Sequence, residues 1–255
     1  MRKVGLIAFK GWPDAGGVAS SSISYIAKIL KAKEIREIHP WRFYNMTSVR
    51  PIVTIKKGIV EKYEPQSIKV MVANAESCEL ILFLGYEPQI NWDLSSDEIL
   101  RILEDYGTQV VILLGGVLDR IPHTRDPIIT YVTFSSEASS LAKRVGAEPS
   151  EYIGLSSFHT FLLNKLNEKG ILSLSLWGHA PYYADSPYLR TSCKLISMLS
   201  SILNIHIPLA ELKIQADVQL RMLDEKVKAD PQLFKEVRDM EVSYDMARKR
   251  PPYAA

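Results

Sequence analysis

Four short apolar runs alternate with segments of helical spacing, and this alternation limits the fold more than any other feature. The runs cover residues 4–9, 80–84, 110–114 and 171–176. Apolar runs of this length, without polar alternation, are typical of strands covered on both faces. Apolar spacings of three and four predict helices over residues 18–30, 95–106, 136–145 and 156–168. The alternation therefore predicts an α/β domain with a mostly parallel sheet.

Smaller elements surround this repeated unit. Apolar residues on both sides of Lys56-Lys57-Gly58 predict a small hairpin, and we expect residues 67–72 to pair beside it. After Pro208 an apolar stripe predicts one helix, and Pro231 suits the first position of another. We expect three parts: an α/β domain over 1–208, a helical hairpin over 209–247 that packs on it or extends from it, and a flexible basic tail over 248–255.

Charge and cysteine content exclude several classes of protein. The 255 residues hold 31 Lys and Arg against 29 Asp and Glu, a net charge of +2, which is too small for a general nucleic-acid binder. Cys78 and Cys193 lie far apart without a CxxC pair, so neither a disulfide framework nor a thiol metal site is indicated. No apolar stretch is long enough to cross a bilayer. We expect a cytoplasmic protein with no membrane partner.

Aromatic, acidic and imidazole side chains follow all four apolar runs. Because the carboxyl ends of parallel strands meet at one edge of a sheet, we expect these side chains to form a pocket or a partner surface there. The residues concerned are Trp12, Asp14 and Gly16 after the first run, Tyr86 and Glu87 after the second, His123 and Arg125 after the third, and Trp177, His179 and Tyr182 after the fourth.

Each of these residues also has a purely structural interpretation. Asp14 precedes a predicted helix and could cap it, and the histidines could anchor loops rather than transfer protons. Arg125 could clamp a carboxylate or a phosphate. The glycines lack the spacing of a nucleotide loop, no GxSxG elbow occurs, and no metal-ligand spacing is present, so we expect no cofactor and no metal. His159 and His206 have no evident role.

Four blocks in the same segments together resemble the PAC2 family, the archaeal and bacterial relatives of proteasome assembly chaperones. The resemblance covers about residues 1–230. It is carried by residues 11–16 (Gly-Trp-Pro-Asp-Ala-Gly), 85–88 (Gly-Tyr-Glu-Pro), 122–125 (Pro-His-Thr-Arg) and 175–181 (Ser-Leu-Trp-Gly-His-Ala-Pro).

The resemblance implies a three-layer αβα domain similar to purine nucleoside phosphorylases, used for protein interaction in cytoplasmic homo-oligomers. Some members end in a hydrophobic-Tyr-any-residue tail that inserts between proteasome α subunits. Here Tyr253 is followed by two alanines, one residue more than that pattern. We therefore expect a non-enzymatic, chaperone-like protein that binds itself and proteasome α subunits, with Tyr253 as the candidate tail residue. The alternative is an enzyme of phosphorylase or hydrolase type that binds a nucleoside or phosphate at the sheet edge.

Overall fold

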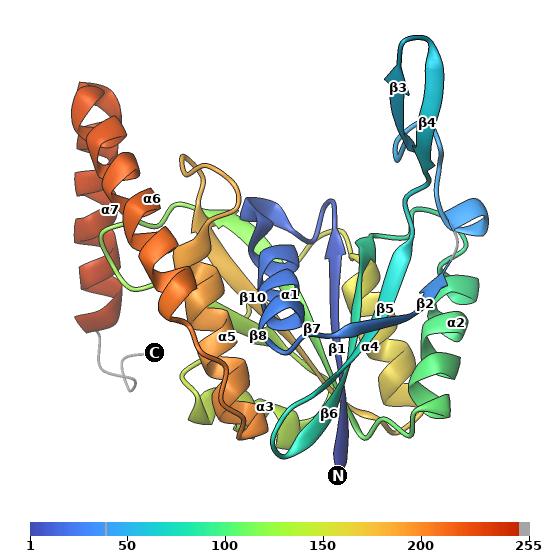
Figure 1. Cartoon of the computed structure of the whole chain (residues 1–255). Coiled ribbons are helices and arrows are strands. Elements are labelled where there is room, and N and C mark those ends of the chain that lie inside the picture. Colours follow the sequence, from blue (N-terminus) through green and yellow to red (C-terminus); the bar gives the residue numbers. More distant parts are fainter. Residues whose placement is uncertain (39, 250–255) are drawn as a thin grey trace.

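The computed structural model describes residues 1–38 and 40–249, and its centre is a mixed sheet of eight strands (Figure 1). From one edge of the sheet to the other, the strands are β2 (Lys33–Ile38), β5 (Ile68–Asn74), β6 (Cys78–Tyr86), β1 (Arg2–Lys10), β7 (Val110–Asp119), β10 (Leu172–Pro181), β8 (Ile129–Val132) and β9 (Glu148–Pro149). The four predicted apolar runs are the central strands β6, β1, β7 and β10, all parallel to one another. The prediction of a mostly parallel sheet is confirmed for this central part.

Strand β5 corrects one sequence-based expectation. Residues 67–72 were expected to pair beside the small hairpin, but β5 pairs with β2 and β6, antiparallel to both. Ile68 and Val70 are buried, so this segment belongs to the core. The link from β5 to β6 spans only residues 75–77, which is too short for a parallel crossover and forces the antiparallel pairing.

Helices cover both faces of the sheet. Along β1, Leu6 and Ala8 pack toward one helical layer while Ile7 and Phe9 pack toward the other, as the two-residue period of a strand requires. This double burial explains the unbroken apolar runs. The first layer holds α1 (Val18–Ile29), α3 (Ser136–Arg144), α5 (Leu189–Leu203) and α6 (Ala210–Ala229), and the second holds α2 (Trp92–Asp105) and α4 (Phe158–Glu168). Two short 3-10 turns cover Ala15–Gly17 and Pro40–Arg42.

The predicted C-terminal helical hairpin is present. Helix α7 (Pro231–Lys249) begins at the proline and runs back along α6, which itself packs on α5 (Figure 1). Val227 of α6 and Val237 and Met240 of α7 are buried, so the predicted apolar stripes face inward. Helix α7 continues to Lys249, within the segment 248–255 for which the sequence predicts a flexible tail. Residues 250–255, including Tyr253, lie outside the described residues.

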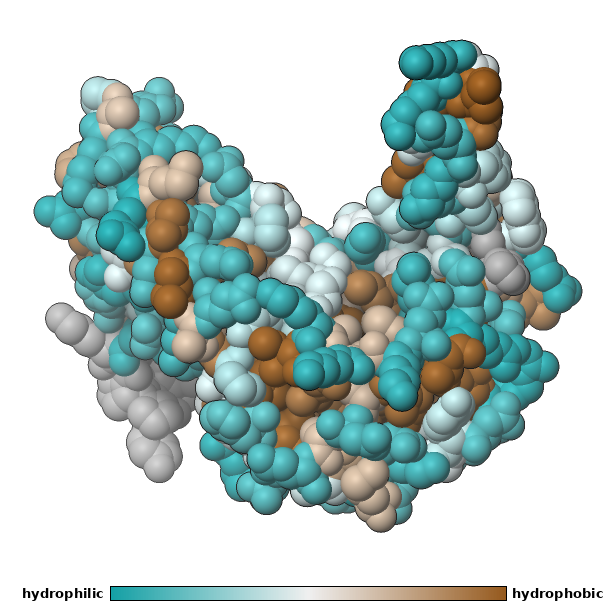
Figure 2. All heavy atoms as spheres, in the orientation of Figure 1, coloured by the Kyte–Doolittle hydropathy of each residue, from teal (hydrophilic) through white to brown (hydrophobic). Residues whose placement is uncertain are grey.

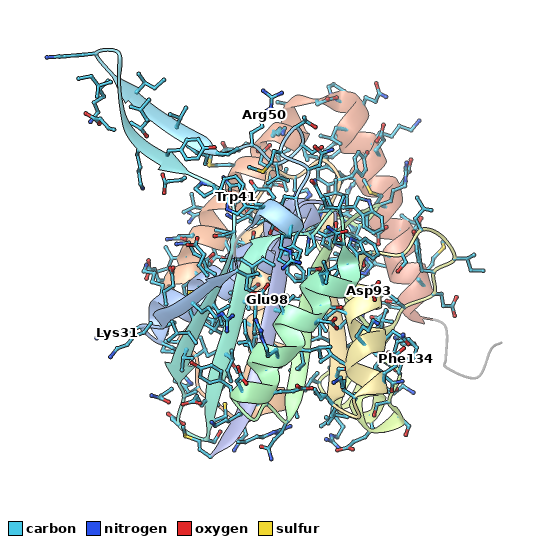
Figure 3. The ribbon with its side chains drawn as sticks, turned by 90° about the vertical axis from the view of Figure 1, so that its right-hand side faces the viewer. Lys31, Trp41, Arg50, Asp93, Glu98 and Phe134 are labelled. Atoms are coloured by element: carbon cyan, nitrogen blue, oxygen red, sulfur yellow. The ribbon has the colours of Figure 1, made fainter. Side chains whose placement is uncertain are left out.

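The predicted small hairpin is also confirmed, and it stands apart from the sheet. Strands β3 (Ile52–Lys56) and β4 (Ile59–Glu64) pair only with each other and rise away from the body of the molecule (Figures 1 and 3). We call residues 52–64 the arm. At its tip Lys57 and Gly58 have φ values of 49° and 79°, the left-handed pair of a type I′ turn.

Both cysteines, Cys78 and Cys193, are free and buried. Within residues 1–38 and 40–249, no helix combines the length and apolarity that a membrane span needs.

Candidate functional site

The carboxyl ends of β6, β1, β7 and β10 share one edge of the sheet, which we call the rim. Two of the predicted loops are partly strand, because β7 and β10 pair without a break from Val110↔Leu172 to Asp119↔Pro181. Trp177 and His179 are therefore strand residues, and the segment holding His123 and Arg125 begins farther along. In consequence eight of the ten predicted site residues separate into three groups, and the other two, Asp14 and Gly16, lie beside the first group.

The first group lines a pocket of about 600 Å³ between the rim and the segment that links β9 to α4. Of the predicted residues, Trp12, Trp177 and His179 line it. Sequence reasoning missed other lining residues that bring polar, aromatic or aliphatic surface, namely Asp119, Thr130, Glu151, Tyr152 and Leu155.

Three polar side chains, joined by hydrogen bonds, lie in the wall of the pocket. Nδ1 of His179 lies 2.8 Å from Oδ2 of Asp119, and Nε2 lies 3.1 Å from the hydroxyl oxygen of Thr130. Nδ1 donates to the carboxylate, which leaves Nε2 to accept from Thr130. The hydrogen bond from His179 lowers the pKa of Asp119, so this carboxylate is ionised at neutral pH. An imidazole between a carboxylate and a hydroxyl is an arrangement that can activate an oxygen nucleophile.

The charge of the pocket is acidic. Its acidic side chains are Asp119 and Glu151, and no lysine or arginine is among its lining residues in the described part of the chain. Such a lining repels phosphate and suits a cationic group, and the rings of Trp12, Tyr152 and Trp177 add aromatic surface of the kind that binds cations.

A buried imidazole lies directly behind the pocket. The His159 ring packs 5.1 Å from the ring of Trp177 and 5.6 Å from that of Phe9, centroid to centroid. Neither ring nitrogen has a hydrogen-bond partner. Burial lowers the pKa of His159 to about 3, so the ring is neutral.

Asp14 and Gly16 shape the backbone beside the pocket. Oδ1 of Asp14 accepts hydrogen bonds from the backbone N–H groups of Ala19 and Ser20, at 2.9 and 3.1 Å. These N–H groups belong to the first turn of α1 and have no acceptor within the helix, so Asp14 caps its N-terminal end. Burial raises the pKa of Asp14. Gly16 has a φ of 66°, and a Cβ there would lie 2.6 Å from the Cβ of Ala180, so the loop after β1 approaches β10 closely.

The second group, Tyr86 and Glu87, lies outside the pocket lining. Oε1 of Glu87 accepts a hydrogen bond from the backbone N–H of Phe158 at 2.8 Å, at the start of α4. Burial raises the pKa of Glu87. The Tyr86 ring lies 5.8 Å from Nζ of Lys10, and its carbonyl accepts from the hydroxyl of Tyr44. Both residues join neighbouring segments of the fold.

The third group, His123, Arg125 and Tyr182, contacts the C-terminal helices. Nε and Nη2 of Arg125 each donate to the carboxylate of Asp245 on α7 at 2.8 Å, a two-point clamp. Tyr182 donates to Glu236 on the same helix. Nδ1 of His123 lies 2.9 Å from the hydroxyl of Tyr183, and burial lowers the pKa of His123. Nε2 of His123 lies 3.7 Å from Oδ1 of Asp224 on α6. The contacts of Arg125 and Tyr182 hold α7 at the rim.

The segment that supplies several of the missed lining residues carries a weak sequence signal. Tyr152, Ile153 and Leu155 place large apolar side chains in a segment without helical or strand period, and all three are exposed. In residues 1–38 and 40–249, no group of three histidine, cysteine or acidic side chains is placed to hold a metal ion.

Comparison with known proteins links this geometry to one family. A model of the PAC2 family matches residues 8–227. A proteasome-assembly chaperone homologue of Mycobacterium tuberculosis is 24% identical with a TM-score of 0.84, over 92% of this chain and 99% of that one. A PAC2 family protein of Streptomyces avermitilis is 26% identical with a TM-score of 0.82, also over 92% and 99%. An archaeal proteasome activator of Pyrococcus furiosus is 17% identical with a TM-score of 0.69, over 88% and 92%. No curated protein matches the chain.

Proposed function

Because the chain belongs to the PAC2 family, we propose that it is a non-enzymatic protein-binding partner that acts as a homo-oligomer, with proteasome α subunits as its clients. The M. tuberculosis relative is described as a proteasome-assembly chaperone homologue, and the P. furiosus relative as a proteasome activator. These descriptions motivate the choice of client.

The proposal rests on the side chains that remain exposed at the rim. Asp14, Glu87 and Arg125 are engaged in contacts within the chain. In contrast, Trp12 is 59% exposed and Leu118 is 52% exposed, and both line the pocket. Exposed aromatic and aliphatic side chains around a rim of satisfied polar groups are typical of a protein-binding surface.

A binding assay with purified α subunits tests this proposal. We expect the full chain to retain α subunits and Trp12→Ser to weaken the complex by at least about tenfold, because buried tryptophans dominate many interfaces. Trp41→Ser is the matched control, since Trp41 is 62% exposed but does not line the pocket.

Removal of residues 249–255 separates rim binding from tail docking. If the shortened chain binds as the full chain does, Tyr253 is dispensable; if it alone fails, the tail and not the rim is the docking element. Failure of both forms to retain α subunits overturns the proposal.

One observation favours a second candidate, a hydrolase. The Asp119–His179–Thr130 chain lies in the wall of a pocket large enough for a small molecule. In this candidate His179 takes the Thr130 proton as the hydroxyl attacks an acyl centre. The acidic lining argues against phosphate or nucleotide substrates.

Covalent labelling tests the second candidate. A fluorophosphonate would form an oxygen–phosphorus bond at Thr130, release fluoride and leave the hydroxyl proton on His179. Mass spectrometry of the labelled protein should locate the adduct at Thr130 and find none in His179→Gln. An unlabelled Thr130 in the wild-type protein removes this candidate.

A further inference from the structure

The arm exposes an apolar face that nothing in the chain covers. Val53 pairs with Tyr63 and Ile55 with Val60, and directly paired residues share one face of a ribbon. All four are exposed, between 47% and 58%. Figure 2 shows brown, apolar spheres along the arm, which projects clear of the body. An isolated two-stranded ribbon has marginal stability in water, so this arm is a surface that requires a partner.

The tip of the arm carries an uncompensated positive charge. Lys56 pairs with Glu61 at 2.8 Å and Lys62 with Glu64 at 2.7 Å. Lys57 has no ion-pair partner among the residues that the structure describes. Its φ of 49° is one at which asparagine, aspartate or glycine is preferred, so local backbone preference does not account for a lysine.

The rim pocket offers the complementary surface. Asp119 and Glu151 give it negative charge, and Glu151 has no ion-pair partner in the described part of the chain. Beside it Tyr152, Ile153 and Leu155 form an exposed apolar ledge. The tip of the arm is cationic and the pocket is acidic, and both are flanked by apolar side chains. The two surfaces are therefore complementary in charge and in hydrophobicity.

We propose that the arm of one copy docks in the rim pocket of a second copy, with Lys57 at Glu151 and the apolar face of the arm over the ledge. The arm projects away from its own body (Figures 1 and 3), so the pocket it enters belongs to another copy. Arm and pocket are different surfaces, so the contact is head-to-tail and repeats into a ring or an open chain. The inference rests on the homo-oligomer of the proposed function and specifies its interface.

A charge exchange tests this interface in the full-length protein. Light scattering over a concentration series should give masses above the 28.8 kDa of one chain. We expect Lys57→Glu and Glu151→Lys each to raise the dissociation constant at least about tenfold, because each places like charges together. The double variant should return to within about threefold of the wild type, since it restores opposite charges.

Lys31→Glu is the matched control. Lys31 is an exposed lysine with a φ of 52°, so it shares the backbone conformation and exposure of Lys57 but lies outside the arm and the pocket. This variant should associate as the wild type does. Circular dichroism of each variant should match the wild type, because both exchanged side chains are exposed.

Two outcomes overturn the inference. One is a wild-type mass near 28.8 kDa at every concentration. The other is an oligomer that the single exchanges do not weaken or that the double exchange does not restore, which would transfer the contact to another surface such as exposed Ile214, Val218 and Met222 of α6. The assay contains no proteasome subunit, so its failure is distinct from failure of client binding.

Discussion

Acidification from pH 7 to 4.5 is expected to lower the free energy of unfolding by about 3 kcal/mol through His159 alone. The unfolded chain binds a proton at this imidazole near its ordinary pKa of 6.5, whereas burial holds the folded pKa at about 3. The stability that depends on the neutral ring is therefore complete above pH 6.5 and is lost progressively as the pH falls toward 3. The ring has no partner that could stabilise its charged form.

His159→Phe isolates this contribution. A phenyl ring keeps the aromatic packing against Phe9 and Trp177 and has no nitrogen to leave unpaired, so we expect no loss of stability at pH 7. Urea unfolding at both pH values should show the variant losing about 3 kcal/mol less than the wild type on acidification. His206→Gln, at an exposed position, is the control and should lose as much as the wild type. Equal losses in His159→Phe and the wild type would show that this ring is not the source.

The central strands could be predicted because their burial is visible locally. A strand covered on both faces has apolar residues at successive positions, as in β1 and β6, and no partner needs to be known to recognise it. Strand β5 could not be placed in the same way. Its alternating pattern, with Lys69 exposed between Ile68 and Val70, suits any half-exposed strand. Only the short connection to β6 and the burial of one face assign it to the main sheet.

The position of the rim could be predicted from topology, but which of its side chains line the pocket and which contact other segments could not. Parallel strands bring their carboxyl ends to one edge, so Trp12, Trp177 and His179 do meet. The direction in which Arg125 points depends on Asp245, a residue 120 positions away on α7. No local pattern records such a contact. His159 had no evident role in the sequence for the same reason, since its burial comes from Phe9 and Trp177 on separate strands.

Phe158→Ala is expected to lower the free energy of unfolding by about 3–5 kcal/mol, the range for deletion of a large buried ring. The side chain is fully buried and makes edge contacts with the rings of Phe9 at 5.3 Å and Trp92 at 5.7 Å. Phe158 also opens α4, where its N–H is held by Glu87. Its removal therefore leaves a cavity between the second helical layer and the sheet.

Two comparisons make this prediction specific. Phe158→Leu keeps most of the buried volume and should cost less than about 2 kcal/mol. Phe134→Ala removes the same ring from a position that is 53% exposed (Figure 3) and should change stability by about 0.5 kcal/mol or less. Urea unfolding of the three variants measures the order of their losses in the free energy of unfolding. Comparable losses for Phe158→Ala and Phe134→Ala would contradict the burial of Phe158 between α4 and the sheet. They would also contradict the position of the pocket wall, because Ser157 and Thr160 reach the pocket from the turn of α4 that Phe158 anchors.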